Sequence, residues 1–207
     1  MLAAVVEVVS HVGYSSMTVS DVITQAGVSR RTFYEHFSNK EDVFLAAYDH
    51  VVDLVLADVS AAYEQGETWI DRVRLGLEAF VSRLAQQPAL AHVCVVEVLA
   101  AGPRALARRS SAMDRFRRFM TPGYDETPAA AGAPSVAADA VIGGIYEVIY
   151  SHVLRGDTAR LPALAPDLLH GMLVPFVGFE DADRASRAAA RSRPGTLRTV
   201  DDGADAL

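Results

Sequence analysis

Apolar side chains recur every three or four residues along most of this chain, and that spacing constrains the fold more than any other feature. The spacing is typical of amphipathic helices and begins at the N-terminus, where one face carries Leu2, Val5, Val9 and Val12. Gly13 can then end this first helix. We find no segment in which apolar and polar residues alternate between turn signals, as they would in a half-buried strand. The sequence therefore predicts an all-α protein.

Two short helices joined by a tight turn are predicted next. Thr18 opens a capping-box-like sequence that starts a helix over about 19–26. Gly27 can take the left-handed conformation that ends a helix sharply. The Ser29 hydroxyl can cap a second helix over about 30–37. Two short helices around a glycine turn are the helix-turn-helix pattern.

The rest of the chain is predicted to form further helices. Ser38 and Glu41 repeat the capping-box pattern ahead of a long helix, and Gly66 ends that helix. Later helices are expected over residues 69–84, 88–96, 103–120, 136–155 and 162–177. From Glu180 the chain is mostly Ala, Arg, Asp and Gly, so a disordered tail is expected there.

The charge of the chain limits how it can meet a nucleic acid. The formal net charge is −7 at pH 7, whereas a protein held to DNA by its overall charge would be basic. Any DNA contact must therefore come from a local cationic patch. Residues 1–50 contain three Lys or Arg residues, which are Arg30, Arg31 and Lys40.

Cysteine usage and hydropathy favour a cytoplasmic protein. Cys94 is the one cysteine, so no intrachain disulfide is expected, and we interpret it as a buried thiol rather than a redox sensor. The apolar N-terminal run lacks the basic start and the small-residue cleavage site of a signal peptide. No apolar stretch is long enough to span a bilayer.

A resemblance to a known family lies in the segment AGVSRRTFYEHFSNKEDVF and in the preceding GYSSMTVSDVITQ. Together they resemble the helix-turn-helix of TetR-family transcriptional regulators, over about the first fifty residues. The remainder matches that family only in helix content and length. The resemblance implies a three-helix DNA-binding head over 1–46 and a helical ligand-binding and dimerisation bundle over 47–179. The disordered tail is predicted over 180–207.

The second short helix carries the residues that we expect to read DNA. A recognition helix places its N-terminal residues at base edges and its flanks on phosphates, and guanidinium groups can pair with guanine or bridge phosphates. The resemblance implies base reading near Arg30 and Arg31 and phosphate contacts around them. The predicted DNA-binding residues are Thr18, Ser29, Arg30, Arg31, Thr32, Tyr34, His36 and Lys40. The small core beneath them is predicted to contain Val22, Ala26, Val28, Phe33 and Phe37.

Members of the family usually carry a helix and a basic arm ahead of the position where this sequence starts. The native start is therefore expected to lie upstream of Met1, or else the DNA contact is thin. Phosphate contacts supply much of the affinity for DNA. We accordingly expect weak binding by a single site and a strong need for dimerisation.

Two C-terminal helices are apolar over a broad arc, and the resemblance implies that they form a four-helix dimer interface. Gly143, Gly144 and Gly171 permit close backbone approach there, and a two-fold operator requires a two-fold protein. The alternative is that both are ordinary core helices. The predicted interface residues are Val141, Ile145, Val148, Ile149, Leu168, Met172 and Phe176.

Ligand pockets are mostly apolar with a few placed polar groups. His92, Cys94 and Glu97 interrupt an otherwise apolar helix. Glu97 is expected either to pair with Arg104 or Arg108 or to recognise a ligand, because a buried carboxylate needs a partner. The predicted ligand-binding residues are Trp69, Phe80, His92, Glu97, Met113, Phe116, Tyr146 and Tyr150.

The resemblance implies a ligand-responsive repressor that binds a palindromic operator as a homodimer. Its expected partners are double-stranded DNA, a small-molecule effector and a second copy, with no membrane. The alternative is a helical small-molecule or protein-binding module whose DNA head is incomplete and does not bind an operator. We find no zinc-like spacing, phosphate loop, GxSxG elbow or dinucleotide fingerprint, so no metal, cofactor or enzymatic activity is predicted. An enzyme on a helical bundle would rest on His92, Cys94 and Glu97 alone, whose spacing fits no known arrangement.

Overall fold

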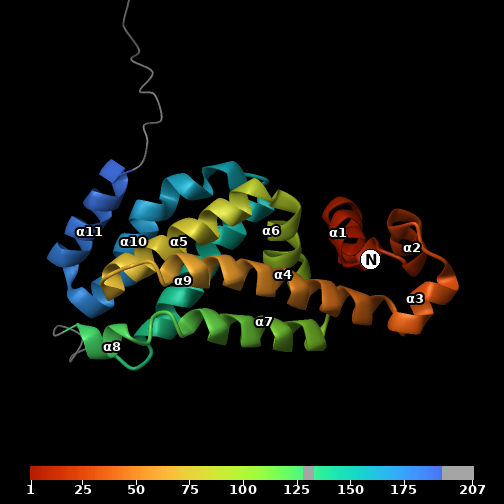
Figure 1. The fold of residues 1–207 in the computed structure, drawn as a ribbon, viewed down its shortest axis with the longest axis horizontal. Coiled ribbons are helices and arrows are strands. Elements are labelled where there is room, and N and C mark those ends of the chain that lie inside the picture. Colours follow the sequence, from red (N-terminus) through yellow and green to blue (C-terminus); the bar gives the residue numbers. More distant parts are fainter. Residues whose placement is uncertain (128–132, 193–207) are drawn as a thin grey trace, which may run out of the picture.

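A helical head at one end of an elongated molecule is joined to a helical body by one long helix (Figure 1). The computed structural model describes residues 1–127 and 133–192, and every regular element in these ranges is helical. The predicted all-α fold is confirmed. The head contains α1 (Leu2–Ser16), α2 (Val19–Ala26) and α3 (Arg30–His36), and the connecting helix is α4 (Lys40–Tyr63).

The head begins and ends its short helices where the local chemistry predicts. Thr18 caps α2 and forms a complete capping box with Asp21. Gly27 ends α2 in the left-handed conformation, with φ 63°, which costs a residue without a Cβ nothing. Ser29 accepts a hydrogen bond from the backbone of Thr32 and starts α3. The predicted helix-turn-helix is therefore confirmed.

The start of α4 differs from the prediction. The capping residue is Asn39, whose side chain accepts a hydrogen bond from Asp42 N at 2.9 Å, and not Ser38. Asn is as good a cap as Ser, and Asn39 stands directly before the first helical residue. The capping pair therefore lies one position later than predicted.

The core of the head is smaller than predicted. Val22 and Phe33 are fully buried against α1 and α4, together with Val5 and Val9. Ala26, Val28 and Phe37 are only partly covered. The three short helices cannot enclose all five predicted side chains, so these three lie at the rim.

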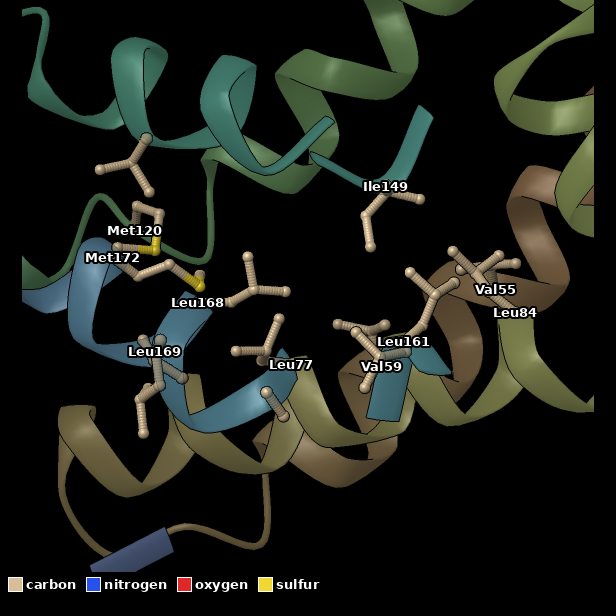
Figure 2. Close-up of a cluster of buried hydrophobic side chains, with 14 of the residues drawn as sticks. Val55, Val59, Leu77, Leu84, Met120, Ile149, Leu161, Leu168, Leu169 and Met172 are labelled. Atoms are coloured by element: carbon tan, nitrogen blue, oxygen red, sulfur yellow. The ribbon is translucent and has the colours of Figure 1, made fainter. Parts of the chain in front are cut away.

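The body surrounds a second hydrophobic core that α4 enters along its C-terminal half (Figure 2). Val55 and Val59 of α4 meet Leu77 and Leu84 of α5 there, opposite Ile149. The elements of the body after α4 are α5 (Trp69–Gln86), α6 (Pro88–Val95), η1 (Glu97–Leu99), α7 (Pro103–Arg117), α8 (Gly123–Glu126), α9 (Ala137–Leu154), η3 (Thr158–Leu164), α10 (Ala165–Val177) and α11 (Phe179–Ser192). No helix within the described ranges has the length and hydropathy needed to cross a bilayer.

The expectation of disorder from residue 180 is wrong for residues 180–192, which form α11. Ala182 and Ala189 are buried, and Ser186 Oγ donates to Pro166 O of α10 at 2.8 Å. Alanines at helical spacing can pack closely on a neighbouring helix and lose little side-chain entropy, although they give almost no hydropathy signal. The remainder of the predicted tail, residues 193–207, lies outside the described residues.

Candidate DNA-binding surface and ligand cavity

The solvent-facing side of α3 carries the two arginines predicted at base edges. Arg30 and Arg31 occupy the first two positions of the helix and are exposed, as is Tyr34 about one turn later. Residues three and four apart lie on the same side of a helix, so these side chains share one surface. The head thus presents two guanidinium groups and a phenol hydroxyl together.

Both arginines have only weak partners within the chain. Arg31 Nε lies 3.0 Å from Glu35 Oε1, and the Arg31 side chain is 89% exposed. Arg30 Nη2 donates to Ser20 Oγ at 3.0 Å. Exposed interactions of this kind contribute little to stability. The two guanidinium groups can therefore exchange these partners for nucleic acid at small cost.

Three other predicted DNA-binding residues are engaged in capping. The Ser29 hydroxyl lies 2.9 Å from the Thr32 hydroxyl, and the Thr18 hydroxyl donates to Asp21 Oδ2 at 2.7 Å. His36 is exposed at the last position of α3. These side chains lie around the exposed arginines. Their contact with DNA stays a prediction.

The ammonium group of Lys40 forms hydrogen bonds within the chain. Its Nζ donates to the carbonyl oxygens of Tyr14, Ser15 and Met17 at 3.1–3.2 Å and lies 4.8 Å from the centre of the Tyr14 ring. Gly13, with φ 76°, interrupts α1 just before these carbonyls, and a cation beside a helix C-terminus is favourable. The interactions of Lys40 thus tie α4 to α1, and its contact with a DNA phosphate stays a prediction.

Glu97 lies at the junction between head and body. Because Gly13 breaks the helical hydrogen-bond pattern, the backbone N–H of Tyr14 is free to donate to Glu97 Oε2, at 2.6 Å. The other carboxylate oxygen, Oε1, lies 3.4 Å from His92 Nδ1, and the Glu97 side chain is 12% exposed. One largely covered carboxylate therefore connects η1 and α6 of the body to α1 of the head.

The predicted pairing of Glu97 with Arg104 or Arg108 is wrong. Arg104 lies 3.0 Å from both Glu41 and Asp42, and Arg108 Nη1 lies 2.9 Å from Asp49 Oδ2. These acidic residues belong to α4, against which α7 packs. The arginines therefore face α4, whereas η1 turns Glu97 towards α1.

A largely apolar cavity of about 110 Å³ lies in the body. Effector pockets generally measure roughly 300–1,000 Å³, so a large ligand would have to separate the helices that enclose this one. The lining comes from α4, α5, α6, α7, α9 and α10 and the segment after α7. Its residues are Tyr48, Val52, Val55, Val59, Tyr63, Val73, Gly76, Leu77, Phe80, Leu84, Cys94, Val95, Arg109, Ala112, Met113, Phe116, Phe119, Met120, Ile142, Ile145, Tyr146, Ile149 and Met172.

Half of the predicted ligand-binding residues line this cavity, namely Phe80, Met113, Phe116 and Tyr146. Trp69 is a core residue instead, whose Nε1 donates to Phe119 O at 3.1 Å. Tyr150 stacks on Tyr146 behind the lining. His92 and Glu97 lie at the junction described above. Helical spacing places these side chains on the inner side of a helix, but it does not say which inner side chains border a cavity.

Arg109 is a charged lining residue that the sequence analysis did not predict. Its guanidinium carbon lies 3.9 Å from the centre of the Tyr146 ring. A signal was present, because Arg109 falls four residues after Ala105 and three before Ala112, two buried positions of α7. A charged residue on the buried face of a helix is unusual.

The hydroxyl and thiol groups of the cavity are protonated at neutral pH. Burial raises the pKa of the Cys94 thiol to about 12, and burial also raises the pKa of Tyr48 and of Tyr146. Burial likewise raises the pKa of Tyr63, the third tyrosine of the lining. Tyr146 Oη donates to Val95 O at 2.6 Å. The cavity therefore combines apolar walls with four neutral polar groups and one guanidinium.

We expect Cys94 to react slowly with a thiol reagent. With its pKa near 12, only about one thiol in 10,000 is ionised at pH 8. Reaction with a chromogenic disulfide should be at least about 100-fold slower in the native protein than in urea, where the thiol regains its ordinary pKa. Equal rates in the two states would contradict this placement of Cys94.

Most of the predicted dimer-interface residues are buried within a single chain. Relative exposure is 9% for Val141 and 1% for Ile149, and Phe176 is fully covered. Leu168 and Met172 also belong to the core of the body, whereas Val148 is 38% exposed and Ile145 is partly covered. The apolar arcs of α9 and α10 therefore face inwards to a large extent, because both helices complete the core around α5.

The outer side of α9 and α10 is nevertheless open and contains small residues. Gly143, Gly144 and Gly171 are exposed, and apart from the adjoining backbone of its own helix no atom lies within 4 Å of the position that a Cβ would take on any of them. Val148 and Leu154 add apolar surface on α9. We call these five residues the glycine face.

The architecture defines a class of protein: an all-helical chain with an exposed helix-turn-helix at one end. Residues 1–47 match the family model described as "Bacterial regulatory proteins, tetR family". The match to the TetR family therefore covers the N-terminal domain of this chain.

Two curated relatives match parts of the chain. The "HTH-type transcriptional activator FasR" of Mycolicibacterium smegmatis is 32% identical over 80 residues, which are 39% of this chain and 36% of that protein. The "Fatty acid metabolism regulator protein" of Bacillus subtilis is 29% identical over 98 residues, 47% of this chain and 50% of that protein. The chain thus spans at most half the length of either relative in these matches.

Solved structures share the whole fold. FadR from Bacillus subtilis, in complex with stearoyl-CoA, aligns with a TM-score of 0.74 and 22% identity, over 86% of this chain and 96% of that one. FadR from Bacillus halodurans aligns with a TM-score of 0.71 and 19% identity, over 84% and 95%. At this identity the likeness establishes the fold alone.

Proposed function

We propose that this protein is a transcriptional regulator that represses its target by binding a palindromic operator as a homodimer and releases it when a small molecule binds. The observation that carries the proposal is the exposed pair Arg30 and Arg31 at the start of α3, on a domain that matches the TetR family. Residues 1–46 would form the DNA-binding domain and 47–179 the effector and dimerisation domain, with the boundary inside α4. These roles would place the protein in the cytoplasm.

The glycine face supports the homodimer. Helices that expose glycine allow a partner helix to approach closely, and a symmetric dimer buries the same patch on both chains. A two-fold pair of heads would set the two copies of α3 one turn of DNA apart, roughly 34–36 Å. Each head offers few cations, so the affinity of one head alone would be low.

The apolar cavity supports an effector with a long hydrocarbon chain. Its walls are aliphatic and aromatic apart from the five polar side chains described above. The curated and structural relatives include regulators of fatty acid metabolism, one of them solved with stearoyl-CoA. We therefore propose a fatty acyl compound as the effector.

The position of the cavity supports a coupling route to DNA. Tyr48 and Val52 of α4 line it, and α4 continues directly into the head. A ligand larger than the cavity would push α4 and α7 apart and alter the spacing of the two heads. Only the difference in DNA affinity between the two states can produce regulation.

A gel-retardation experiment with DNA from upstream of the protein's own gene tests this function. We expect a retarded band at low salt that weakens steeply as salt rises and that stearoyl-CoA removes. Absence of retardation by an intact dimer would favour the alternative, a ligand-binding helical module without operator function. A target gene that becomes more active when the protein is supplied would overturn the proposed repression.

Replacing Glu97 with alanine should loosen the connection between head and body. The Tyr14 N–H would lose its acceptor and His92 its carboxylate, and an unsatisfied buried group costs about 1–3 kcal/mol. The free energy of unfolding in urea should fall by that amount. Amide hydrogen exchange at residues 13–17 should become faster.

Asp53→Ala is the matched control for the Glu97 variant. It also removes one carboxylate, but its pair with Arg115 is exposed, so its cost should stay below about 1 kcal/mol. Equal unfolding free energies for the two variants would contradict the junction role of Glu97.

A further inference from the structure

We propose that Arg109 binds an oxyanion at the polar end of the effector, so that the cavity selects apolar chains that carry a negative charge. The inference rests on the proposed function, because it takes the cavity in the body to be the effector site. It adds the chemical class of the ligand's polar end and the residue that recognises it.

The other arginines of α7 all have carboxylate partners. Arg104, Arg108 and Arg115 pair with acidic residues of α4, at 3.0, 2.9 and 2.7 Å. Arg117 pairs with Asp114 at 3.3 Å. Within the described parts of the chain, Arg109 alone among these five has no ion pair. The arginines on the outer side of α7 are therefore all paired with carboxylates, whereas Arg109, on its inner side, has no counter-charge.

Arg109 is also the α7 arginine that borders the cavity. Its Nε is buried and makes no hydrogen bond. The face of the Tyr146 ring, 3.9 Å from the guanidinium carbon, stabilises the cation in part. The guanidinium also interacts with the Tyr146 hydroxyl, but neither the ring face nor this neutral hydroxyl supplies a negative charge. The Nε donor stays available to another group.

The cavity holds no anion that could balance this charge. None of the described residues that line it is Asp or Glu. The raised pKa values of Cys94, Tyr48, Tyr63 and Tyr146 keep these four groups neutral. An unpaired cation in an apolar site is unfavourable, and a negatively charged ligand group would remove that cost on binding.

The shared chemistry of the ligand is an oxyanion attached to a long apolar chain. A guanidinium pairs in bidentate fashion with carboxylate and with phosphate. The oxyanion can therefore be the carboxylate of a free fatty acid or a phosphate of an acyl-CoA. A fatty alcohol supplies the same chain without the charge.

Titration calorimetry of the full chain without DNA separates these ligands. The probes are dodecanoate, dodecanoyl-CoA and 1-dodecanol. We expect one of the anionic probes to bind about 10- to 100-fold more tightly than the alcohol, as for a charge-assisted hydrogen bond. The preferred anionic probe identifies the source of the oxyanion.

The variant Arg109→Gln should reduce this preference to within about threefold and leave the affinity for 1-dodecanol unchanged. Its melting temperature should equal or exceed that of the wild type, since an unpaired charge is removed. Arg108→Gln is the matched control, because it removes the neighbouring cation that pairs with Asp49 on the outer side. It should keep the full preference. Arg109→Lys, which keeps the charge, should retain a partial preference.

Two results would overturn the inference while leaving the effector site in place: binding of 1-dodecanol as tight as that of both anionic probes, or an undiminished preference in folded Arg109→Gln. If folded wild-type protein binds none of the three probes yet still retards its operator, the inference and the acyl effector both fail. The proposed DNA-binding role would then stand alone.

Discussion

Replacing Arg30 and Arg31 together with alanine will abolish sequence-selective DNA binding while leaving the fold intact. Each bidentate arginine–guanine pair contributes about 1–3 kcal/mol of discrimination. Loss of two such pairs should weaken operator binding by at least about 30-fold. Selectivity over unrelated DNA should fall to nearly nothing. Fluorescence anisotropy with operator and scrambled duplexes measures both quantities.

The fold should tolerate this change because neither side chain is part of the core. Arg30 would lose one hydrogen bond to Ser20, and Arg31 one exposed ion pair with Glu35. Such contacts are worth little, and alanine is a good helix former. The free energy of unfolding should change by less than about 1 kcal/mol.

A matched control is available at the far end of the molecule, on α11 (Figure 1). Arg184 and Arg187 are exposed and pair with acidic residues of their own helix, at 2.9 Å in both cases. The double alanine variant there removes the same charge and should bind the operator almost normally. If the α3 double variant keeps its selectivity, α3 is not the recognition helix.

Replacing Gly144 with glutamate will leave the protein monomeric. Apart from the adjoining backbone of its own helix, no atom lies within 4 Å of the position of a Cβ on Gly144, so the single chain has room for the new side chain. In a two-fold dimer built on the glycine face, the same substitution places two carboxylates close to the symmetry axis. Burying like charges against each other costs several kcal/mol, which exceeds what a close glycine contact supplies.

The monomer itself should be as stable as the wild-type chain or slightly more so. Glutamate is a better helix former than glycine by roughly 0.5–1 kcal/mol. Sedimentation velocity should therefore show a folded monomer, and operator affinity should fall at least about 100-fold because one head alone binds weakly. Ala107→Glu, on the exposed side of α7, introduces the same charge outside the glycine face and should stay dimeric. A Gly144→Glu protein that remains dimeric would place the interface elsewhere.

The predictable parts of the head depend on residues close together in sequence. The capping box of Thr18, the left-handed Gly27 and the Ser29 cap each involve atoms within four residues of one another. Such interactions are nearly independent of the rest of the fold, so residue type and spacing suffice to predict them. The exposure of Arg30 and Arg31 follows from the same pattern.

The contacts of three charged residues were out of reach, because each depends on a partner far along the chain. Lys40 binds the end of α1, which lies 23–26 residues earlier. Glu97 binds the backbone 83 residues away. Arg109 meets the ring of Tyr146 across the bundle. Hydropathy and helix propensity carry no information on which elements will be neighbours.

By itself the amino-acid order therefore determined the helix-turn-helix of the head, the caps of its two short helices and the exposure of Arg30 and Arg31, since these arise from interactions within one or two turns. Only the tertiary structure decided that Lys40 and Glu97 form contacts between helices, that Arg109 faces the cavity, and which side of α9 and α10 stays open. The physical reason is that desolvation and pairing of a charge depend on what surrounds it in space, and helices distant in sequence supply those surroundings.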